Sequence, residues 1–323
     1  MPTDTQTLTP VSISVQPRQF VDNIVLPLLP RLRLYDPSRK PRGLKKLGRK
    51  IAQAADGIVH GWMRLPARGV FTVQLAGGGS GTLEIDAHQS AYLAFASRRM
   101  HGGYELAETL FLEAMLAKSS CFYDIGANWG YYTLCAATHP EFKGTIHAFD
   151  ISDQMNTAIS HMADTLGLTD VEVMGYGLSN HSGEVSISAD RAAQFTKVIT
   201  ESGQGAVRGV TARIVRLDDV DRPAPDLMKI DVEDHELAVF EGGREMLEQR
   251  RPVILFESRI EGDGGTAGAF LRALGYHIYH LQLRDGPVPG IELLPIDAGG
   301  APSGEHFNLV AVPAGDEARW FGQ

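Results

Sequence analysis

The stretch DIGANWGYY, residues 124–132, decides the fold of this chain. It overlaps the short apolar segment 121–125, which predicts a buried strand, and runs into 129–138, whose apolar spacing predicts a helix. A strand, a glycine turn and a helix in succession are typical of the ligand-binding edge of an open α/β sheet. Gly126 permits the sharp turn, and Gly130 permits close approach of a ligand with the helix packed behind it.

The chain on both sides of this stretch continues the alternation of helices and strands. Further strands are predicted at 145–149, 171–174, 227–230, 252–256, 276–283 and 307–312, and helices at 104–116, 152–167, 235–250 and 266–274. Additional β structure is predicted within 184–217. Strands that alternate with helices at this spacing indicate an α/β fold, with a mostly parallel sheet and helices on both faces.

The composition of the loop at 124–130 bears on the kind of cofactor. A dinucleotide site requires a third glycine beside the pyrophosphate, and here that position is Tyr131. Asp124 suits a cationic or amine-bearing group, such as the sulfonium and α-amino groups of S-adenosylmethionine (SAM). Asp150 ends the second strand and can accept hydrogen bonds from both ribose hydroxyls of an adenosine, which NAD and SAM share. Two structural roles stay open: a glycine turn without a ligand, and an acid at a helix N-terminus near Ser152.

Six motifs in the expected order resemble the FkbM-type family of SAM-dependent methyltransferases. They are DIGANWG (124–130), FD (149–150), LDDV (217–220), KIDVEDHE (229–236), ILFE (254–257) and NLVAV (308–312). The resemblance covers residues 104–313. It implies a class I methyltransferase (Rossmann-like) fold with a seven-stranded sheet, SAM as cofactor, and O-methylation of a hydroxyl on a sugar, glycan or secondary metabolite. It also implies cofactor contacts from Asp124, Gly126, Asn128, Gly130 and Asp150.

The chain departs from the family pattern at two positions. Asp150 stands where Glu is more usual, which shortens the reach to the ribose by one methylene group. Asp234 stands where the family usually has Gly in its Glu-Gly pair. A bulkier, charged residue there is expected to reshape the substrate side of the loop.

The second motif concentrates acidic groups at the end of a predicted strand, on the same sheet edge as the cofactor loop. Methyl transfer to a hydroxyl requires removal of its proton, and Asp231 or His235 can act as the base. Alternatively, Asp231, Glu233 and Glu257 can bind a divalent cation such as Mg²⁺ that acidifies the hydroxyl.

A purely structural interpretation of the second motif is also open. Glu233 and Glu236 can cap and solvate the helix that follows, with Lys229 paired to one of them. Three other functions compete with O-methylation: a non-catalytic SAM-fold partner in a biosynthetic complex, an N-methyltransferase, and a nicotinamide-linked oxidoreductase. The complete set of acidic residues argues against the first, and the absent third glycine argues against the last.

Charge is distributed unevenly along the chain. The net charge of −9 argues against nucleic acid as a partner, so a small-molecule or glycan acceptor is expected. Residues 31–50 nevertheless hold nine of the 30 basic residues against one acid, Asp36. This run is either a solvated surface that pairs with the acidic body or a peripheral contact with an anionic membrane.

The N-terminal third is predicted to be an extension to the main domain. We expect a loosely attached tail at 1–20, a tail and basic segment over 1–69, a β-hairpin lead-in at 70–103, and the methyltransferase domain at 104–323. The hairpin rests on strands at 70–75 and 82–86 around the turn GGGSG. The chain shows neither the residue order of a signal peptide nor an apolar run long enough for a membrane span, so a cytoplasmic location is expected.

Overall fold

A computed structural model describes most of the chain. The described residues are 8–25, 67–86, 94–95, 104–188, 209–258, 265–284, 290–296 and 307–322, with several positions between 47 and 65. Residues 87–93 and 96–103 lie outside this set, so the domain boundary expected near residue 103 stays a prediction.

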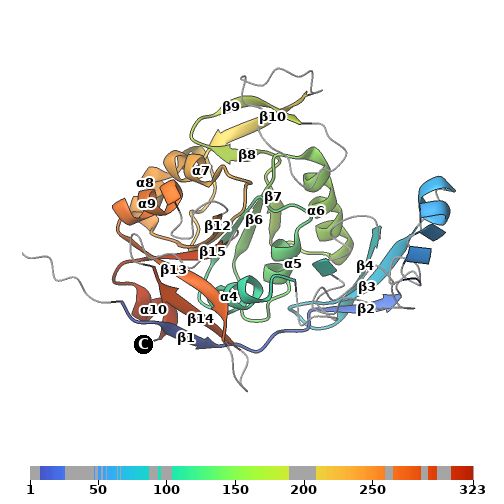
Figure 1. Ribbon diagram of the computed structural model, residues 1–323, viewed down its shortest axis with the longest axis horizontal. Helices are drawn as coiled ribbons and strands as arrows, with labels where there is room; N and C mark the ends of the chain where they lie inside the picture. Colours follow the sequence, from blue (N-terminus) through green and yellow to red (C-terminus); the bar gives the residue numbers. More distant parts are fainter. Residues whose placement is uncertain are drawn as a thin grey trace, which may run out of the picture.

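A nine-stranded mixed sheet forms the centre of the molecule, in the order β1-β14-β13-β15-β12-β11-β5-β6-β7 (Figure 1). Its strands are β1 (Val11–Ser14), β5 (Cys121–Ile125), β6 (Thr145–Phe149), β7 (Val171–Val173), β11 (Leu227–Ile230), β12 (Val253–Ser258), β13 (Tyr276–Leu283), β14 (Gly290–Pro295) and β15 (Phe307–Pro313). The run from β7 through β12 is parallel. β15 enters antiparallel between β12 and β13.

Seven of these strands, from β13 to β7, have the order and directions of a class I methyltransferase sheet. The fold class predicted from the sequence is therefore confirmed. The sheet has nine strands rather than seven because β14 and β1 extend the edge beyond β13. Chain order jumps from β5 to β11 at the centre, which creates the switch point where open α/β sheets bind ligands.

Helices cover both faces of the sheet. One hydrophobic core contains buried side chains of α4 (Leu106–Leu116), α5 (Tyr131–Ala137), α6 (Asp153–Leu166) and α10 (Glu317–Phe321). The other contains buried side chains of α7 (Glu236–Gly242), α8 (Arg244–Arg250) and α9 (Gly265–Ala273). Successive β5 residues face opposite cores, with Phe122 in the first and Tyr123 in the second. This alternation explains why most residues of the central parallel strands are apolar.

The helix predicted over 235–250 is two helices, α7 and α8, that meet at Gly242 and Gly243. A Cβ on Gly242 would lie 1.9 Å from the backbone oxygen of Ser179, and one on Gly243 would lie 2.5 Å from the Leu217 side chain. The two glycines therefore let the chain pass close to a second layer of β structure. The two consecutive glycines are the feature of the sequence from which this break between helices could have been predicted.

Two three-stranded sheets flank the main one. The hairpin predicted around GGGSG is confirmed as β3 (Arg68–Gln74) and β4 (Ser80–Asp86), and β2 (Val21–Val25) pairs with β3. The β structure predicted within 184–217 is also present, as β9 (Gly183–Ser188) and β10 (Gly209–Arg216). The third strand of this sheet is β8 (Gly177–Ser179), which lies outside the predicted range and pairs with β10. This second small sheet lies over the carboxyl ends of the central strands (Figure 1).

The loosely attached tail expected at residues 1–20 is wrong for residues 8–20. β1 pairs with β14 at the edge of the main sheet. Arg18 donates hydrogen bonds to the backbone oxygens of Cys135 (2.7 Å) and Thr138 (2.6 Å), at the carboxyl end of α5. Its guanidinium also lies 3.5 Å from the buried carboxylate of Glu113. Residues 8–20 therefore belong to the folded body, because β1 pairs with the main sheet and Arg18 binds the end of α5. A cation at a helix C-terminus is stabilising.

His139, close to Arg18, links stability to pH. Burial lowers its pKa to about 4, and the charges of Arg18 and Lys143 add to the effect. As pH falls below the ordinary histidine value of 6.5, the unfolded chain binds a proton that the native state rejects. The free energy of unfolding therefore falls between about pH 6.5 and pH 4, by as much as about 3 kcal/mol from this group.

We expect His139→Gln to remove that part of the pH dependence. Glutamine retains an acceptor for the Glu141 N–H, which bonds to His139 Nδ1 at 3.3 Å. Urea unfolding of both proteins across this pH range measures the difference. Parallel stability curves for the two proteins would show that His139 does not titrate as described.

Candidate active site

The loop after β5 is shaped around Gly126. Its φ is +71°, and a Cβ there would lie 1.8 Å from the backbone oxygen of Asp231, so only glycine fits. The N–H groups of Gly126 and Ala127 donate to the Phe149 oxygen at 2.9 and 3.0 Å. Asn128, with φ +51°, turns the chain toward α5. These constraints join the carboxyl ends of β5, β6 and β11 at one point.

Gly130 ends the loop and packs away from it. A Cβ on Gly130 would lie 2.9 Å from Met162 and 3.1 Å from Ile159, both in α6. Gly130 is not among the residues that line the neighbouring cavity. It therefore supplies close packing of α5 against α6, one of the two roles expected for it, while its contact with a ligand stays a prediction.

Asp150 lies at the end of β6, beside this loop. One carboxylate oxygen accepts the Asn128 N–H and the other accepts the Ser152 N–H, both at 2.8 Å. Burial raises the pKa of Asp150, while these two hydrogen bonds oppose the rise. Each oxygen keeps a second lone pair, so Asp150 can hold the loop and the helix start and still accept hydroxyl protons from a ligand.

Asp124 does not face the cavity. Its side chain is 0% exposed, accepts a 2.6 Å hydrogen bond from the Thr133 hydroxyl, and lies 4.0 Å from the Lys229 ammonium. The carboxylate of Asp124 thus lies beside a lysine of the protein, and its direct contact with the cationic part of a cofactor stays a prediction. Burial raises the pKa of Asp124, and Lys229 opposes this.

Lys229 is a buried cation that connects the two motifs. It donates to the Gly126 oxygen at 3.0 Å and lies 3.5 Å from the Asp231 carboxylate. Burial disfavours its charged form, but the carboxylates of Asp231, Asp124 and Glu105 outweigh burial and raise its pKa. Lys229 therefore stays protonated and pairs with Asp231 and Asp124, not with Glu233 or Glu236 as the structural interpretation expected.

The loop from Asp231 to His235 has unusual backbone geometry. Glu233 and Asp234 have φ values of +57° and +72°. The family preference for Gly at the second of these positions follows from that angle, which Asp tolerates better than most residues. Of the five non-glycine residues with positive φ in the described part of the chain, four lie at this edge of the sheet: Glu105, Asn128, Glu233 and Asp234. Backbone strain of this kind clusters at functional sites.

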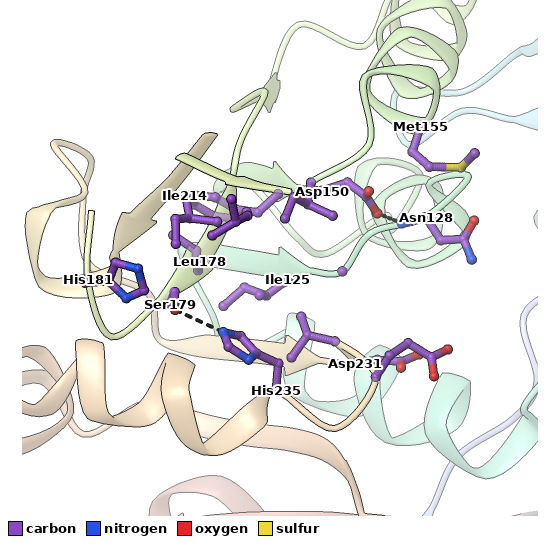
Figure 2. A pocket seen from close by; sticks show the side chains of 17 residues that line it. Ile125, Asn128, Asp150, Met155, Leu178, Ser179, His181, Ile214, Asp231 and His235 are labelled. Carbon is purple, nitrogen blue, oxygen red and sulfur yellow. Dashed lines mark hydrogen bonds between the residues drawn. The ribbon is translucent and has the colours of Figure 1, made fainter. Parts of the chain in front are cut away.

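His235 faces the same cavity from its other side. Its Nε2 atom shares a 2.9 Å hydrogen bond with the hydroxyl of Ser179, which is fully buried in β8 (Figure 2). Burial lowers the pKa of His235, and His181 adds a smaller effect. The imidazole is therefore neutral near pH 7. Sequence reasoning missed Ser179 and His181, which no motif marks.

These elements enclose one cavity at the carboxyl edge of the central strands. Asn128 and Asp150 lie on one side of it and His181, Ser179 and His235 on the other (Figure 2). Of the residues predicted from the sequence, Gly126, Asn128, Asp150, Asp231, Glu233 and His235 line it. The apolar part of the wall consists of Ile125, Phe149, Ile151, Met155, Leu178, Val185, Ile214 and Val232. The site thus combines a large apolar wall with a few polar groups, as ligand sites do.

The metal site expected from Asp231, Glu233 and Glu257 is not assembled. Glu257 lies in β12 opposite Asn308 of β15 and does not line the cavity. Within the described ranges, no group of three or more His, Cys, Asp and Glu side chains is placed to hold a metal ion. The magnesium expected from the sequence has no support in this geometry.

The segment before α4 approaches the same edge. Glu105 has φ +41° and accepts a 2.5 Å hydrogen bond from the Tyr132 hydroxyl. The Tyr104 ring packs edge-on against Tyr131, with ring centres 5.0 Å apart. Burial raises the pKa of Tyr104, and the charges of Glu105 and Asp231 raise it further. Tyr104 and Glu105 therefore lie within electrostatic reach of Asp231.

The sheet order is that of class I SAM-dependent methyltransferases, and the cavity lies at its switch point. Residues 124–278 match the family model described as the methyltransferase FkbM domain, which confirms the resemblance found in the sequence. The matched residues include both loops of the cavity, from Gly126 to His235.

Known proteins show distant similarity to this chain. It is 27% identical over 169 residues to the hexuronic acid methyltransferase AglP of Haloferax volcanii, covering 52% of this chain and 67% of that protein. A crystal structure of methyltransferase FkbM from Methylobacillus flagellatus is 15% identical, with a TM-score of 0.36 over 54% of this chain. The match spans only 43% of that protein's chain. A SAM-dependent O-methyltransferase from Thermotoga maritima is 11% identical over 75% of this chain and 77% of its own, with a TM-score of 0.38.

Proposed function

We propose that this protein transfers the methyl group of SAM to a hydroxyl oxygen of a sugar, a glycan or a related secondary metabolite. The observation that carries the proposal is the cavity at the switch point, where Asn128, Asp150, Asp231 and His235 converge. The similarity to a hexuronic acid methyltransferase supports a sugar as acceptor.

The residues of the cavity fit SAM. The Asn128 side-chain oxygen is buried without a hydrogen-bond partner among the described residues, so it is available to an ammonium or hydroxyl donor. Asp150 has free lone pairs for ribose hydroxyls. Ile151, Met155 and Leu178 provide apolar surface for an adenine ring. When bound, SAM supplies an electrophilic methyl group on a sulfonium.

Asp231 is the base in this proposal. Its carboxyl lines the cavity, and the buried ammonium of Lys229 lies 3.5 Å from the Asp231 carboxylate. It also lies within electrostatic reach of Tyr104, and an acceptor hydroxyl can approach it from the cavity. Asp231 orients that hydroxyl and takes its proton as the oxygen–carbon bond forms. His235, neutral and hydrogen-bonded to Ser179, lies on the far side of the cavity and contributes to binding.

The alternative assignment, with His235 as the base, makes a different prediction. In the proposed mechanism, His235→Gln lowers kcat/KM by less than about tenfold and leaves the shape of its pH profile between pH 6 and 8 unchanged. Glutamine retains a polar group for Ser179. The measurement is SAM-dependent methylation of a panel of sugars that includes hexuronic acids, followed by mass spectrometry.

Two results of that experiment would contradict the proposal. A loss of about a hundredfold or more, together with disappearance of an acid limb near or below pH 6.5, would assign the base to His235. Methylation of the carboxylate of a hexuronic acid, located by mass spectrometry of the product, would indicate a carboxylate acceptor, which has no proton to remove. Hexuronic acids offer both kinds of oxygen, so the same panel distinguishes them.

We also propose that the basic run at 31–50 attracts the protein to anionic membranes, consistent with an acceptor held at a membrane. Apart from positions 47 and 50, this run lies outside the described residues. Removing residues 1–50 would also remove β1, β2 and Arg18, so replacing Lys45, Lys46, Arg49 and Lys50 with Gln is the better test. Vesicle binding that falls in this variant at low salt supports the proposal. A cytoplasmic location stays a prediction.

A further inference from the structure

Exposed apolar side chains are concentrated in one segment of the described chain. The described residues include nine large apolar side chains that are exposed, and six of these nine lie between positions 47 and 65. These six are Leu47, Ile51, Ile58, Trp62, Met63 and Leu65. Trp62 is 82% exposed. Single exposed apolar residues are ordinary, but a group of this size on one short segment marks an interaction surface.

Four of these side chains form two pairs, and the members of each pair are four residues apart. Leu47 and Ile51 are at helical positions, and Ile58 and Trp62 lie in the π-helical turn Gly57–Trp62. Side chains four residues apart lie on the same face of a helical turn. Figure 1 shows the turn, in light blue, projecting beyond the β2–β3–β4 sheet at the edge of the molecule. Leu47, Ile51, Ile58 and Trp62 are called the apolar stripe below.

The distribution of charge along the chain indicates which kind of surface the apolar stripe binds. The twenty residues 31–50 hold nine basic residues and one acid, whereas the remaining 303 residues hold 21 basic and 38 acidic residues. An anionic surface therefore attracts this end of the chain and repels the rest, which orients the apolar stripe toward that surface. Lys50 is exposed and helical beside Ile51. Basic residues beside Trp, Leu and Ile are typical of helices that lie in a membrane interface.

We propose that the apolar stripe inserts into the headgroup region of an anionic lipid bilayer. None of the helices in the described part of the chain is long and apolar enough to cross a membrane. This proposal rests on exposed side chains and does not depend on the methyl transfer or on the acceptor proposed above.

The test is flotation of the full chain with vesicles of phosphatidylcholine alone or mixed with phosphatidylglycerol. We expect binding to the mixed vesicles, and a loss of about tenfold or more in the partition coefficient for the Ile58→Gln, Trp62→Gln double variant. The matched control is Val210→Gln, which removes a 50% exposed apolar side chain from β10 and should change binding less than about twofold. An unchanged Kd for SAM shows that each variant is folded.

Two further measurements distinguish insertion of the apolar stripe from electrostatic attraction by the basic residues alone. The loss in the double variant should persist at high salt, whereas neutralising Lys45, Lys46, Arg49 and Lys50 should matter only at low salt. Brominated lipids should quench wild-type tryptophan fluorescence and not that of Trp62→Phe. Absence of vesicle binding, or equal binding by the double variant, would overturn the proposal. So would a dimer that the double variant dissociates while vesicle binding stays unchanged, because a second copy would then cover the stripe.

Discussion

The Gly126→Ala protein should bind SAM at least about a hundredfold more weakly than the wild type, a loss of about 2.7 kcal/mol. A Cβ at this position would lie 1.8 Å from the Asp231 backbone oxygen, and φ is +71°. Either the Gly126 loop or the Asp231 loop must move, and both line the cavity. We expect the free energy of unfolding to fall by about 2–4 kcal/mol as well.

Gly167→Ala is the matched control for this substitution. Gly167 also has a positive φ, +64°, but it ends α6 and has nothing within 4 Å of an added Cβ. It should cost about 1 kcal/mol of stability and leave the Kd for SAM unchanged. Calorimetric titration and urea unfolding of the two variants measure both effects. Wild-type affinity in Gly126→Ala would show that the cofactor does not bind at this loop.

Asp231→Asn should lower kcat by about a hundredfold to ten-thousandfold while changing the Kd for SAM little. The substitution keeps the size of the side chain and its place beside Lys229, but it removes the proton acceptor that the mechanism requires. The measurement is single-turnover methyl transfer to the best acceptor from the sugar panel. Single-turnover rates separate the chemical step from binding and product release.

Asp234→Asn provides the control for the second motif. Asp234 is exposed three residues further along the same loop and does not line the cavity. Its amide variant removes one negative charge, as Asp231→Asn does, and should retain kcat within about threefold. If Asp231→Asn kept its kcat, or if both variants lost the same amount, Asp231 would not be the base.

The fold could be predicted from the sequence because its signals are local. The buried parallel strands β5, β6, β11 and β12 are mostly apolar, and a helix follows each of them. The two strands added at the edge of the sheet, β1 and β14, were harder to predict from the sequence. β1 has only four residues, and its partner β14 follows it by more than 270 positions, so the pairing of Val11 with Leu293 leaves no trace in either segment alone.

The active site could be predicted where the backbone determines its composition. The turn at Gly126 and Asn128 could be predicted because tight turns with positive φ restrict residue type. The burial of Asp124 beside Lys229 could not be predicted, because it arises from the pairing of β5 with β11. Ser179 could not be found, since it meets His235 across 56 residues of sequence and lies on a strand without a motif.

The most direct test of the account is calorimetric titration of the full chain with SAM and S-adenosylhomocysteine, with NAD as the control and Asp150→Ala as the variant. The account predicts micromolar binding of both SAM-type ligands, no binding of NAD, and a loss of about tenfold or more in Asp150→Ala, because a buried carboxylate that accepts ligand hydroxyls is removed. Binding of NAD instead of SAM, or SAM binding that Asp150→Ala leaves unchanged, would contradict the assignment of this cavity as the cofactor site.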